Sequence, residues 1–524
     1  MPSTTGIVDS LVDFRVGQLL SHLPFRPQLV LYFILGPIAA VLTWLVVSEA
    51  FSPLRKYPGP FLARYTNLWR LGLTISGRYH WVIEDLHKKY GPVVRIGPNL
   101  LDIDYPETIK TSKTEFYHNH SSYVNGKLTY HVFSTTDPAE HARLKRPYVN
   151  HFTVGAVMAL EPHMETVIAD LIKQLDNRFV KGPEGQKTLD LGEWINFYAW
   201  DLITSATFSR RFGYMDAGCD HDSTLKSVQK SINYFAVVGQ MPWLDFVLDK
   251  NPIVRIGPPH LANMIGITVG NLFNRIQGKD PNYTPKTPDF LQHFIDAKTT
   301  HPDIVDDGTI IGYLLVNLGA GADTTATSLR SAFYYSLKRP AVYKRLEKEV
   351  RAMGWDKDKP VSYSAARQVA YLEAVLLEAF RYHPAVAMPL ERYVPDTGLT
   401  LPDGSFVPPG TAVGVNPYIA GRNKSVYGDD ADEFRPERWL QASGEGDEEY
   451  RVRMQKYHAG DLTFGGGSRS CVGKNFALME SFKVLATLVN RYDIELADPD
   501  KEWVTWSRWF IWQEGIFTKL SLRE

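Results

Sequence analysis

Cysteine is scarce in this chain, which has two among its 524 residues, Cys219 and Cys471. Two thiols cannot build a disulfide framework, so small disulfide-stabilised secreted domains are excluded, and we expect the main body to face a reducing compartment. An excess of one charge is lacking too, because 57 Lys and Arg are balanced by 58 Asp and Glu. The net charge of −1 gives no overall attraction to nucleic acid, so we expect no nucleic-acid partner.

Long apolar runs are also few, and the clearest one lies near the N-terminus. No charged residue interrupts 29–47, and this segment is long enough to cross a bilayer. A cleaved signal peptide fits poorly, because a polar lead precedes the run and no small-residue cleavage site is evident; a buried helix is the other alternative. More basic residues follow the run than precede it, where Arg15 and Arg26 stand, which places its C-terminal side in the cytosol. We predict a segment 1–52 with one transmembrane helix, then a stiff Pro-rich hinge at 53–60.

The rest of the chain, 61–524, is expected to form one large, mainly helical body. Hydrophobic residues make up 44% of the sequence, which is enough for a sizeable core. Apolar periodicity and the positions of proline and glycine predict helices over 79–90, 154–175, 194–208, 309–338 and 371–382. Two short strands are expected within 93–104, and an aromatic loop over 111–136.

Cys471 stands in a glycine-rich loop, Phe464-Gly465-Gly466-Gly467-Ser468-Arg469-Ser470-Cys471-Val472-Gly473, which a helical pattern follows at once. A thiolate is a strong ligand for haem iron, and nearby backbone N–H groups, a helix N-terminus or cations stabilise it. The glycines let the backbone turn beneath a flat ring, and Arg469 can pair with a carboxylate of that ring. The alternative for Cys471 is an ordinary buried thiol. Cys219 is interpreted as a spectator.

This loop matches the haem-ligand signature of the cytochrome P450 family at five positions: Phe464, Gly467, Arg469, Cys471 and Gly473. The chain therefore resembles a haem-thiolate monooxygenase of the microsomal type, and its Pro-rich hinge is similar to that of fungal members that act in secondary metabolism. The resemblance implies a mainly α fold with a small β-rich region that binds haem b (iron protoporphyrin IX). It implies Cys471 as the metal ligand, with Phe464, Gly467 and Arg469 among the haem-binding residues.

The run Gly319-Ala320-Gly321-Ala322-Asp323-Thr324-Thr325 lies in the middle of the predicted helix 309–338. Two glycines and two threonines weaken a helix interior, and small residues let a flat cofactor or O2 approach the backbone. A hydroxyl beside a carboxylate can order a proton relay, whereas packing between crossed helices is the alternative. The match of 320–325 to the family's pattern implies that Asp323 and Thr324 are catalytic and deliver protons.

Further basic residues resemble the family's propionate-binding positions. His141 and Lys145 lie one turn apart on a helix that Asp137 and Pro138 are expected to start. The family places a Trp or His there and an Arg four residues later, so Lys145 departs from the pattern, because lysine neutralises a propionate only as a point charge. A solvated basic face is the alternative. Arg392 matches another propionate-binding arginine.

A second set of charged residues is implied to support the haem loop and not to react. Glu378 and Arg381 lie one turn apart on a predicted helix, and Arg438 follows in Phe434-Arg435-Pro436-Glu437-Arg438-Trp439. In the resembled family these three groups form a buried network, and buried charges persist only when they are paired.

The resemblance implies a monooxygenase that oxidises a hydrophobic small molecule with O2 and with electrons from NADPH through a reductase, with cytochrome b5 as a second candidate donor. It would be a single-pass protein of the endoplasmic reticulum membrane with its catalytic domain in the cytosol. Candidate pocket residues are Val316, Val386, Met388 and the turn 512–515. Two alternatives stay open: the same haem fold catalysing oxidative coupling, ring closure or rearrangement, and a non-catalytic haem carrier or sensor.

Overall fold

The chain divides into two units, Met1–Lys56 and Tyr57–Glu524, and their boundary lies inside the predicted hinge. The part of the predicted N-terminal segment before residue 27, with Arg15 and Arg26, lies outside the described residues. The computed structural model describes residues 27–108, 112–124, 127–181, 187–258 and 261–524.

The described part of the N-terminal unit contains one helix, α2 (Pro27–Ala50), of 24 residues. Its large apolar side chains from Leu35 to Val47 are mostly exposed within this unit, Trp44 among them. Among the residues that the structure describes, no helix is both long and apolar enough to cross a membrane. The prediction of a transmembrane helix at 29–47 is therefore not confirmed.

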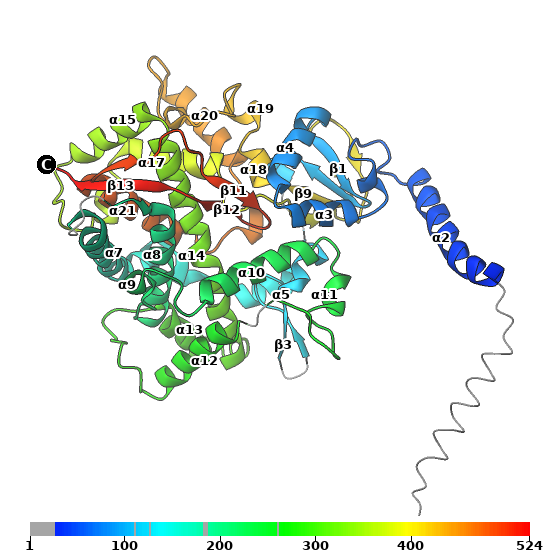
Figure 1. Cartoon of the computed structure of the whole chain (residues 1–524), viewed down its shortest axis with the longest axis horizontal. Coiled ribbons are helices and arrows are strands. Elements are labelled where there is room, and N and C mark those ends of the chain that lie inside the picture. The colour runs from blue at the N-terminus through cyan, green and yellow to red at the C-terminus, as the bar shows by residue number, and fades with distance from the viewer. Residues whose placement is uncertain (1–26, 109–111, 125–126, 182–186, 259–260) are drawn as a thin grey trace, which may run out of the picture. The chain divides into compact units, whose positions relative to one another are not determined.

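The second unit, Tyr57–Glu524, is organised around the long helix α14 (Asp307–Leu337) (Figure 1). Asp306 caps its first turn, because the Asp306 carboxylate accepts a hydrogen bond from the Thr309 N–H at 2.7 Å. The helix ends at Lys338, and Pro340 begins the next helix, as expected for a residue that tolerates only the first turn. The helix predicted at 309–338 is thus confirmed.

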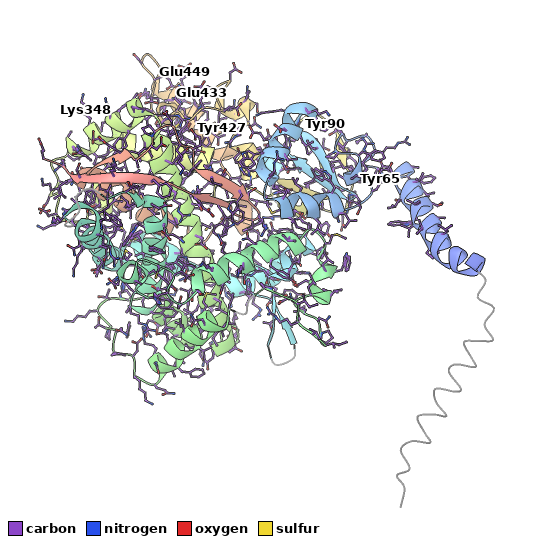
Figure 2. All side chains as sticks on the ribbon, in the orientation of Figure 1. Tyr65, Tyr90, Lys348, Tyr427, Glu433 and Glu449 are labelled. Carbon is purple, nitrogen blue, oxygen red and sulfur yellow. The ribbon has the colours of Figure 1, made fainter. Side chains whose placement is uncertain are left out.

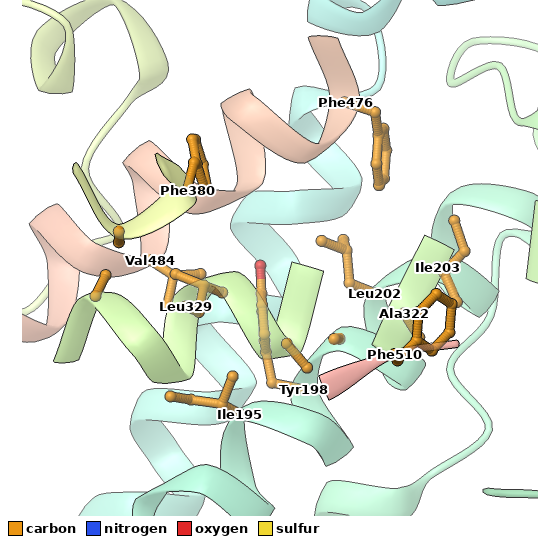
Figure 3. Close-up of a cluster of buried hydrophobic side chains, with 14 of the residues drawn as sticks. Ile195, Tyr198, Leu202, Ile203, Ala322, Leu329, Phe380, Phe476, Val484 and Phe510 are labelled. Atoms are coloured by element: carbon orange, nitrogen blue, oxygen red, sulfur yellow. The ribbon is translucent and has the colours of Figure 1, made fainter. Parts of the chain in front are cut away.

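Helices α8 (Leu191–Phe208), α17 (Ala370–Tyr382) and α21 (Lys474–Arg491) are among those that pack directly on α14 and enclose the core. Figure 3 shows their apolar side chains meeting in one cluster. Labelled members of this cluster are Ile195 and Leu202 of α8, Leu329 of α14, Phe380 of α17 and Val484 of α21. The apolar face expected after the cysteine loop is buried here, so the core fixes the start of α21 beside α14.

A small four-stranded sheet has the order β1-β2-β9-β6. Its strands are β1 (Val93–Gly97), β2 (Leu100–Ile103), β9 (Ala412–Val415) and β6 (Leu390–Tyr393). Strands β2 and β9 are parallel and the other pairs are antiparallel. A three-stranded sheet has the order β10 (Tyr492–Leu496), β13 (Phe517–Leu522) and β5 (Leu189–Asp190), so the segment before α8 pairs with the last strand. Strands β11 (Val504–Ser507) and β12 (Ile511–Glu514) form a separate hairpin. The mainly α fold with a small β-rich region is confirmed.

The remaining helices and strands have these bounds: α3 Leu68–Ser76, α4 Tyr79–Tyr90, α5 Pro138–Lys145, α6 Val154–Met158, α7 Glu161–Leu175, α9 Tyr214–Ala217, α10 Thr224–Val238, α11 Trp243–Val247, α12 Ala262–Ile276, α13 Phe290–Thr300, α15 Pro340–Arg351, α16 Tyr363–Ala366, α18 Pro417–Ala420, α19 Lys424–Tyr427, α20 Asp447–Gly460, β3 Ser122–Val124, β4 Lys127–Thr129, β5 Leu189–Asp190, β7 Leu399–Thr400, β8 Phe406–Val407, β10 Tyr492–Leu496 and β13 Phe517–Leu522. The predictions for 79–90 and 93–104 are confirmed. The pattern over 154–175 forms two helices instead of one, because Pro162 occupies the first turn of α7 and the chain turns before it.

A buried charge network joins α17 to the segment before the cysteine loop. The Glu378 carboxylate accepts hydrogen bonds from Arg381 Nη2 at 2.7 Å and from Arg438 Nε at 3.0 Å. Burial opposes ionisation of Glu378, but the two arginines outweigh it and lower the pKa of this carboxyl. Both arginines also donate to backbone carbonyls, including those of Glu433 and Tyr427, whose side chains Figure 2 labels.

Candidate active site

The loop before α21 turns through two left-handed glycines. Gly465 has a φ of 68° and Gly467 a φ of 64°, values that residues with a Cβ rarely adopt. The Cys471 N–H donates to the Phe464 carbonyl at 2.8 Å, so the loop closes on itself. Cys471 is thereby fixed just ahead of Gly473, the N-cap of α21.

Opposing effects act on the Cys471 thiol. Burial raises the pKa of Cys471, whereas the N–H groups of Gly473 and Lys474, and the charges of Lys474 and Lys145, lower it. These donors belong to the start of α21, so the helix dipole acts in the same direction. The side chain is nevertheless accessible. The thiol is thus accessible and also close to protein groups that favour its ionisation, and a bound metal cation would favour the thiolate further.

The middle of α14 has an open face. Ala320 is exposed and Thr324, one turn later, is half-buried, whereas Asp323 is buried. Thr324 Oγ1 donates to the Ala320 carbonyl at 2.8 Å, which orients the hydroxyl on that face. A Cβ on Gly321 would lie 2.8 Å from Ile203 Cδ1, so this glycine marks the close approach of α8. The structure therefore places Thr324 on the open face and Asp323 toward α8.

Asp323 has a polar partner inside the body. Its Oδ1 accepts a hydrogen bond from Trp200 Nε1 at 3.1 Å. Burial raises the pKa of Asp323 to about 6, although this hydrogen bond and the charge of Arg330 oppose the shift. A carboxyl with such a pKa exchanges protons readily near neutral pH, as a proton relay requires.

Thr325 faces a different neighbour from Thr324. Its hydroxyl donates to the Gly321 carbonyl at 3.1 Å, and the side chain is hydrogen-bonded to Glu480 of α21. Thr325 is buried, so adjacent threonines of the motif serve different faces of α14.

Five basic side chains act on one another beside the cysteine loop: Lys113, His141, Lys145, Arg392 and Arg469. Burial, followed by the charge of Arg392, lowers the pKa of Arg469 to about 10. Burial and the same neighbouring cations lower the pKa of His141 to about 3 and that of Lys113 well below its usual value. In the part of the chain that the structure describes, no ion pair joins Lys113, Lys145, Arg392 or Arg469 to a carboxylate.

Backbone carbonyls hold these cations in place. Lys145 Nζ donates to the Ser468 carbonyl at 3.1 Å, Arg469 Nη1 to that of Thr135 at 2.9 Å and Arg392 Nη1 to that of Glu391 at 2.8 Å. Crowded, partly desolvated cations destabilise one another, and an anion among them reverses that effect. The donor set suits the two propionates of a haem, and the predicted residues His141, Lys145, Arg392 and Arg469 all belong to it.

Lys113 was not identified from the sequence. It pairs through an isolated β-bridge with Arg392, and its Nζ donates to the Phe133 carbonyl at 2.6 Å. In the sequence, Lys113 is only a lysine within the aromatic loop 111–136, and nothing around it indicates a binding role. The proximity to Arg392 arises from pairing between distant segments, which no local pattern indicates.

An aromatic cluster joins the loop 111–136, α10 and the turn between β11 and β12. Ring centroids of Phe116 and Phe235 are 5.0 Å apart, and those of Phe235 and Trp509 are 5.4 Å apart. Phe133 and Tyr117 complete the contacts with Trp509. This cluster brings apolar aromatic rings from three separate segments together.

The prediction that 512–515 forms a pocket turn is wrong in its boundaries. Trp512 lies within β12, and its Nε1 donates to Asn233 Oδ1 at 3.0 Å. The turn before β12 instead brings Phe510 into a β-bridge with the predicted pocket residue Val386. Residues 512–514 form a strand and not a turn because they pair with β11.

The fold and the cysteine loop together define the class of haem-thiolate enzymes, and the chain belongs to the cytochrome P450 family, whose model ("Cytochrome P450") matches residues 58–515. It is therefore a haem-dependent monooxygenase, an oxidoreductase. It is 44% identical to cytochrome P450 monooxygenase cfoH of Aspergillus candidus over 96% of this chain and 95% of that protein. It is 35% identical to cytochrome P450 monooxygenase cicH of Emericella nidulans over 91% of this chain and 96% of that protein.

The family implies a haem, and the residues present fit it. Cys471 is accessible at the N-terminus of α21, and the basic cluster beside it offers sites for two carboxylates. Cys219 is exposed and far along the chain from every motif, as its interpretation as a spectator requires.

Proposed function

We propose that this chain is a membrane-anchored monooxygenase that inserts oxygen into a hydrophobic small molecule of secondary metabolism. The single observation that carries the proposal is the position of Cys471, accessible and surrounded by the donors of α21. The names of the fungal relatives support the reaction class, and the aromatic cluster around Trp509 supports an apolar substrate.

The residues have distinct roles in this proposal. A bound haem with a thiolate ligand supplies the activation of O2, since the thiolate favours O–O cleavage. Cys471 would hold the iron, and the basic cluster with Arg469 and Arg392 would neutralise the propionates. Thr324 presents its hydroxyl on the open face of α14, and Asp323 supplies protons to that hydroxyl. The intact Asp323–Thr324 pair favours oxygen insertion over coupling or rearrangement.

We propose haem b as the cofactor. The two cysteines, Cys219 and Cys471, lie far apart in the sequence, so no Cys-x-x-Cys-His motif exists for covalent attachment. Electrons are proposed to come from NADPH through a separate reductase, with cytochrome b5 as a second donor, as the resemblance to microsomal members implies.

Membrane attachment is part of the proposal. Helix α2, of 24 residues, has mostly exposed apolar side chains between Leu35 and Val47, which supports attachment to a membrane. No charged residue occurs in it before Glu49. The catalytic unit also has exposed apolar side chains on α3 and α11, including Leu68, Trp243 and Phe246. We propose the endoplasmic reticulum membrane, with the catalytic unit in the cytosol.

The test replaces Cys471 by Ser and records the absorption of the reduced carbonyl complex. The full-length wild type is expected to show the thiolate-type Soret band, and Cys471→Ser is expected to lose it. Persistence of the band in the variant would remove Cys471 as the ligand and would overturn the assignment. Cys219→Ser is the matched control and should keep the band.

A further inference from the structure

A line of buried polar groups runs between α8 and α14, from Asp323 to the surface. Its inner end is the hydrogen bond from Trp200 Nε1 to Asp323 Oδ1 at 3.1 Å. Its outer end is the hydrogen bond from Arg330 Nε to the Gly192 carbonyl at 2.7 Å. Going from the outer bond to the inner one, the residue number rises along α8, from 192 to 200, and falls along α14, from 330 to 323, so the two helices are antiparallel. At 1.5 Å per residue, the two hydrogen bonds are about 10 Å apart along the helix axis.

Two amide side chains lie between these ends. Asn196 is one helical turn from both Gly192 and Trp200, on the same stripe of α8. Gln513 of β12 reaches the same level of α14, where its Nε2 donates to the Thr327 carbonyl at 3.1 Å. Both side chains have a buried oxygen, Asn196 Oδ1 and Gln513 Oε1, for which the structure shows no hydrogen-bond partner.

The outer end of the line reaches acidic groups at the surface. The charges of Asp190, Glu193 and Glu514 act on the buried Arg330 guanidinium, as does that of Asp323. Glu193 and Glu514 are exposed to solvent, whereas Arg330 is buried. Arg330 therefore separates the inner carboxylate from carboxylates that exchange protons with bulk water.

Packing alone does not account for this line. Burying an amide oxygen without a hydrogen-bond partner is energetically unfavourable, and two such oxygens, Asn196 Oδ1 and Gln513 Oε1, occur at the same level. A buried polar atom of this kind is the usual partner of an internal water molecule. The bond between Trp439 Nε1 and Glu378 Oε2, at 2.9 Å, provides a contrast within the same protein. There the carboxylate is closed in by arginines, and neither of its oxygens is an unpartnered buried atom.

We propose that this line is the route by which protons from solvent reload Asp323, through waters held by Asn196 and Gln513. This inference rests on the proposed function of Asp323. When Asp323 gives its proton toward the Thr324 hydroxyl, a water beside Asn196 donates a proton to the Asp323 carboxylate. That water is reprotonated through the water chain from Glu193, which takes a proton from bulk solvent. Arg330 stays protonated, orients the waters and opposes the entry of cations other than protons.

Trp200 and Asn196 are positioning residues in this proposal, and hydrogen exchange tests them without turnover. In full-length protein with 15N-labelled tryptophan, the indole N–H of Trp200 should exchange with D2O at least about tenfold faster than that of Trp439, because water reaches only the former. Trp200→Phe and Trp439→Phe assign the two signals. Equal protection of both indoles would overturn the inference.

Variants sharpen the test. Asn196→Leu and Gln513→Leu should each slow exchange at the Trp200 indole by about tenfold, and Asn196→Ser, which keeps a polar group, should restore most of it. Ser331→Ala is the matched control on α14, since its hydroxyl bonds within its own helix, to the Ser328 carbonyl. Two leucine variants are made so that the test can still be carried out if one of them does not fold. Unchanged exchange in a folded leucine variant would overturn the inference.

A second measurement separates this inference from the proposed function. With reductase, NADPH and O2 as the only reactants, Asn196→Leu should raise the solvent deuterium isotope effect on NADPH consumption about twofold or more. A folded variant with an unchanged isotope effect would contradict the route. If the wild-type protein does not show the thiolate-type Soret band, the proposed function is contradicted instead, whatever the hydrogen-exchange data show.

Discussion

The Glu378 carboxylate accepts a hydrogen bond from Arg438 Nε at 3.0 Å, although the two residues are 60 positions apart in the chain. Both side chains are fully buried. The bond ties α17 to the segment that leads into the cysteine loop, so the position of Cys471 depends on charges that never meet solvent.

Removing one partner of the Glu378–Arg438 pair should lower the stability of the fold. Arg438→Met leaves the Glu378 carboxylate buried with fewer partners, and we expect a loss of about 3–5 kcal/mol in the free energy of unfolding. Urea denaturation followed by circular dichroism measures it. Arg143→Ala, which removes a half-exposed partner of Glu140, is the control and should cost about 0–1 kcal/mol. Similar losses in both variants would contradict a supporting role for the network.

The basic cluster should control haem retention. Lys113→Ala and Lys145→Ala each remove a cation beside the propionate sites, so haem should transfer to apomyoglobin several-fold faster than from the wild type. Lys145→Arg should keep or slow the wild-type rate, because arginine adds a forked donor set. Arg143→Ala is the control, since Arg143 is exposed and paired with Glu140. Equal transfer rates in all variants would place Lys145 on a solvated face.

Substitutions of Thr324 and Asp323 should affect NADPH consumption and peroxide release in different ways. Thr324→Ala should keep NADPH consumption fairly high while hydrogen peroxide release rises, because electrons arrive but protons are misdirected. Asp323→Asn should slow consumption itself, and loss of a positioned proton donor typically costs about 10²–10⁴-fold where transfer limits the rate. The assay compares peroxide formed with NADPH consumed, with reductase present.

Thr325→Val is the control for that comparison, because the Thr325 hydroxyl bonds Gly321 and Glu480 and not the open face. It should leave the ratio of peroxide to NADPH close to that of the wild type. An unchanged ratio in Thr324→Ala would count against the relay and would favour the coupling or rearrangement chemistry.

Asp104 should make stability depend on pH. Burial raises its pKa from 3.8 to about 7, and its Oδ1 has no hydrogen-bond partner. An acid with a raised folded-state pKa binds its proton more tightly when folded, so stability falls as the pH rises from about 4 to about 7. Asp104→Asn should stabilise the fold at pH 8 by about 1–3 kcal/mol and change little at pH 4. Asp85→Asn, at an exposed position of α4, is the control for the substitution itself.

Deletion of residues 1–50 should lower membrane association and leave haem incorporation largely intact, because no haem-binding residue lies there. Fractionation of membranes and the carbonyl difference spectrum measure the two quantities. Residual membrane binding is expected from the exposed apolar side chains of α3 and α11. Loss of haem with unchanged membrane binding would instead assign α2 to the core.

Local patterns predicted the parts of the site that lie within one segment. The glycines at 465 and 467, the N-cap Asp137 and the long helix 309–338 follow from residue types at fixed spacing. Contacts between distant segments were not predictable in this way. Trp200 meets Asp323 across 123 positions, and Lys113 meets Arg392 through a β-bridge. Such contacts depend on which helices and strands pack together, and a single sequence does not contain that information in local form.

The 2.8 Å that would separate a Cβ at Gly321 from Ile203 matters to anyone who redesigns this enzyme. A side chain introduced at Gly321 would first have to displace the end of the Ile203 side chain, so the effect of a substitution at 321 depends on the residue at 203. Changing Ile203 to a smaller residue at the same time removes the collision. Productive diversity at this helix crossing is therefore expected in pairs of positions, and single-site saturation would miss it.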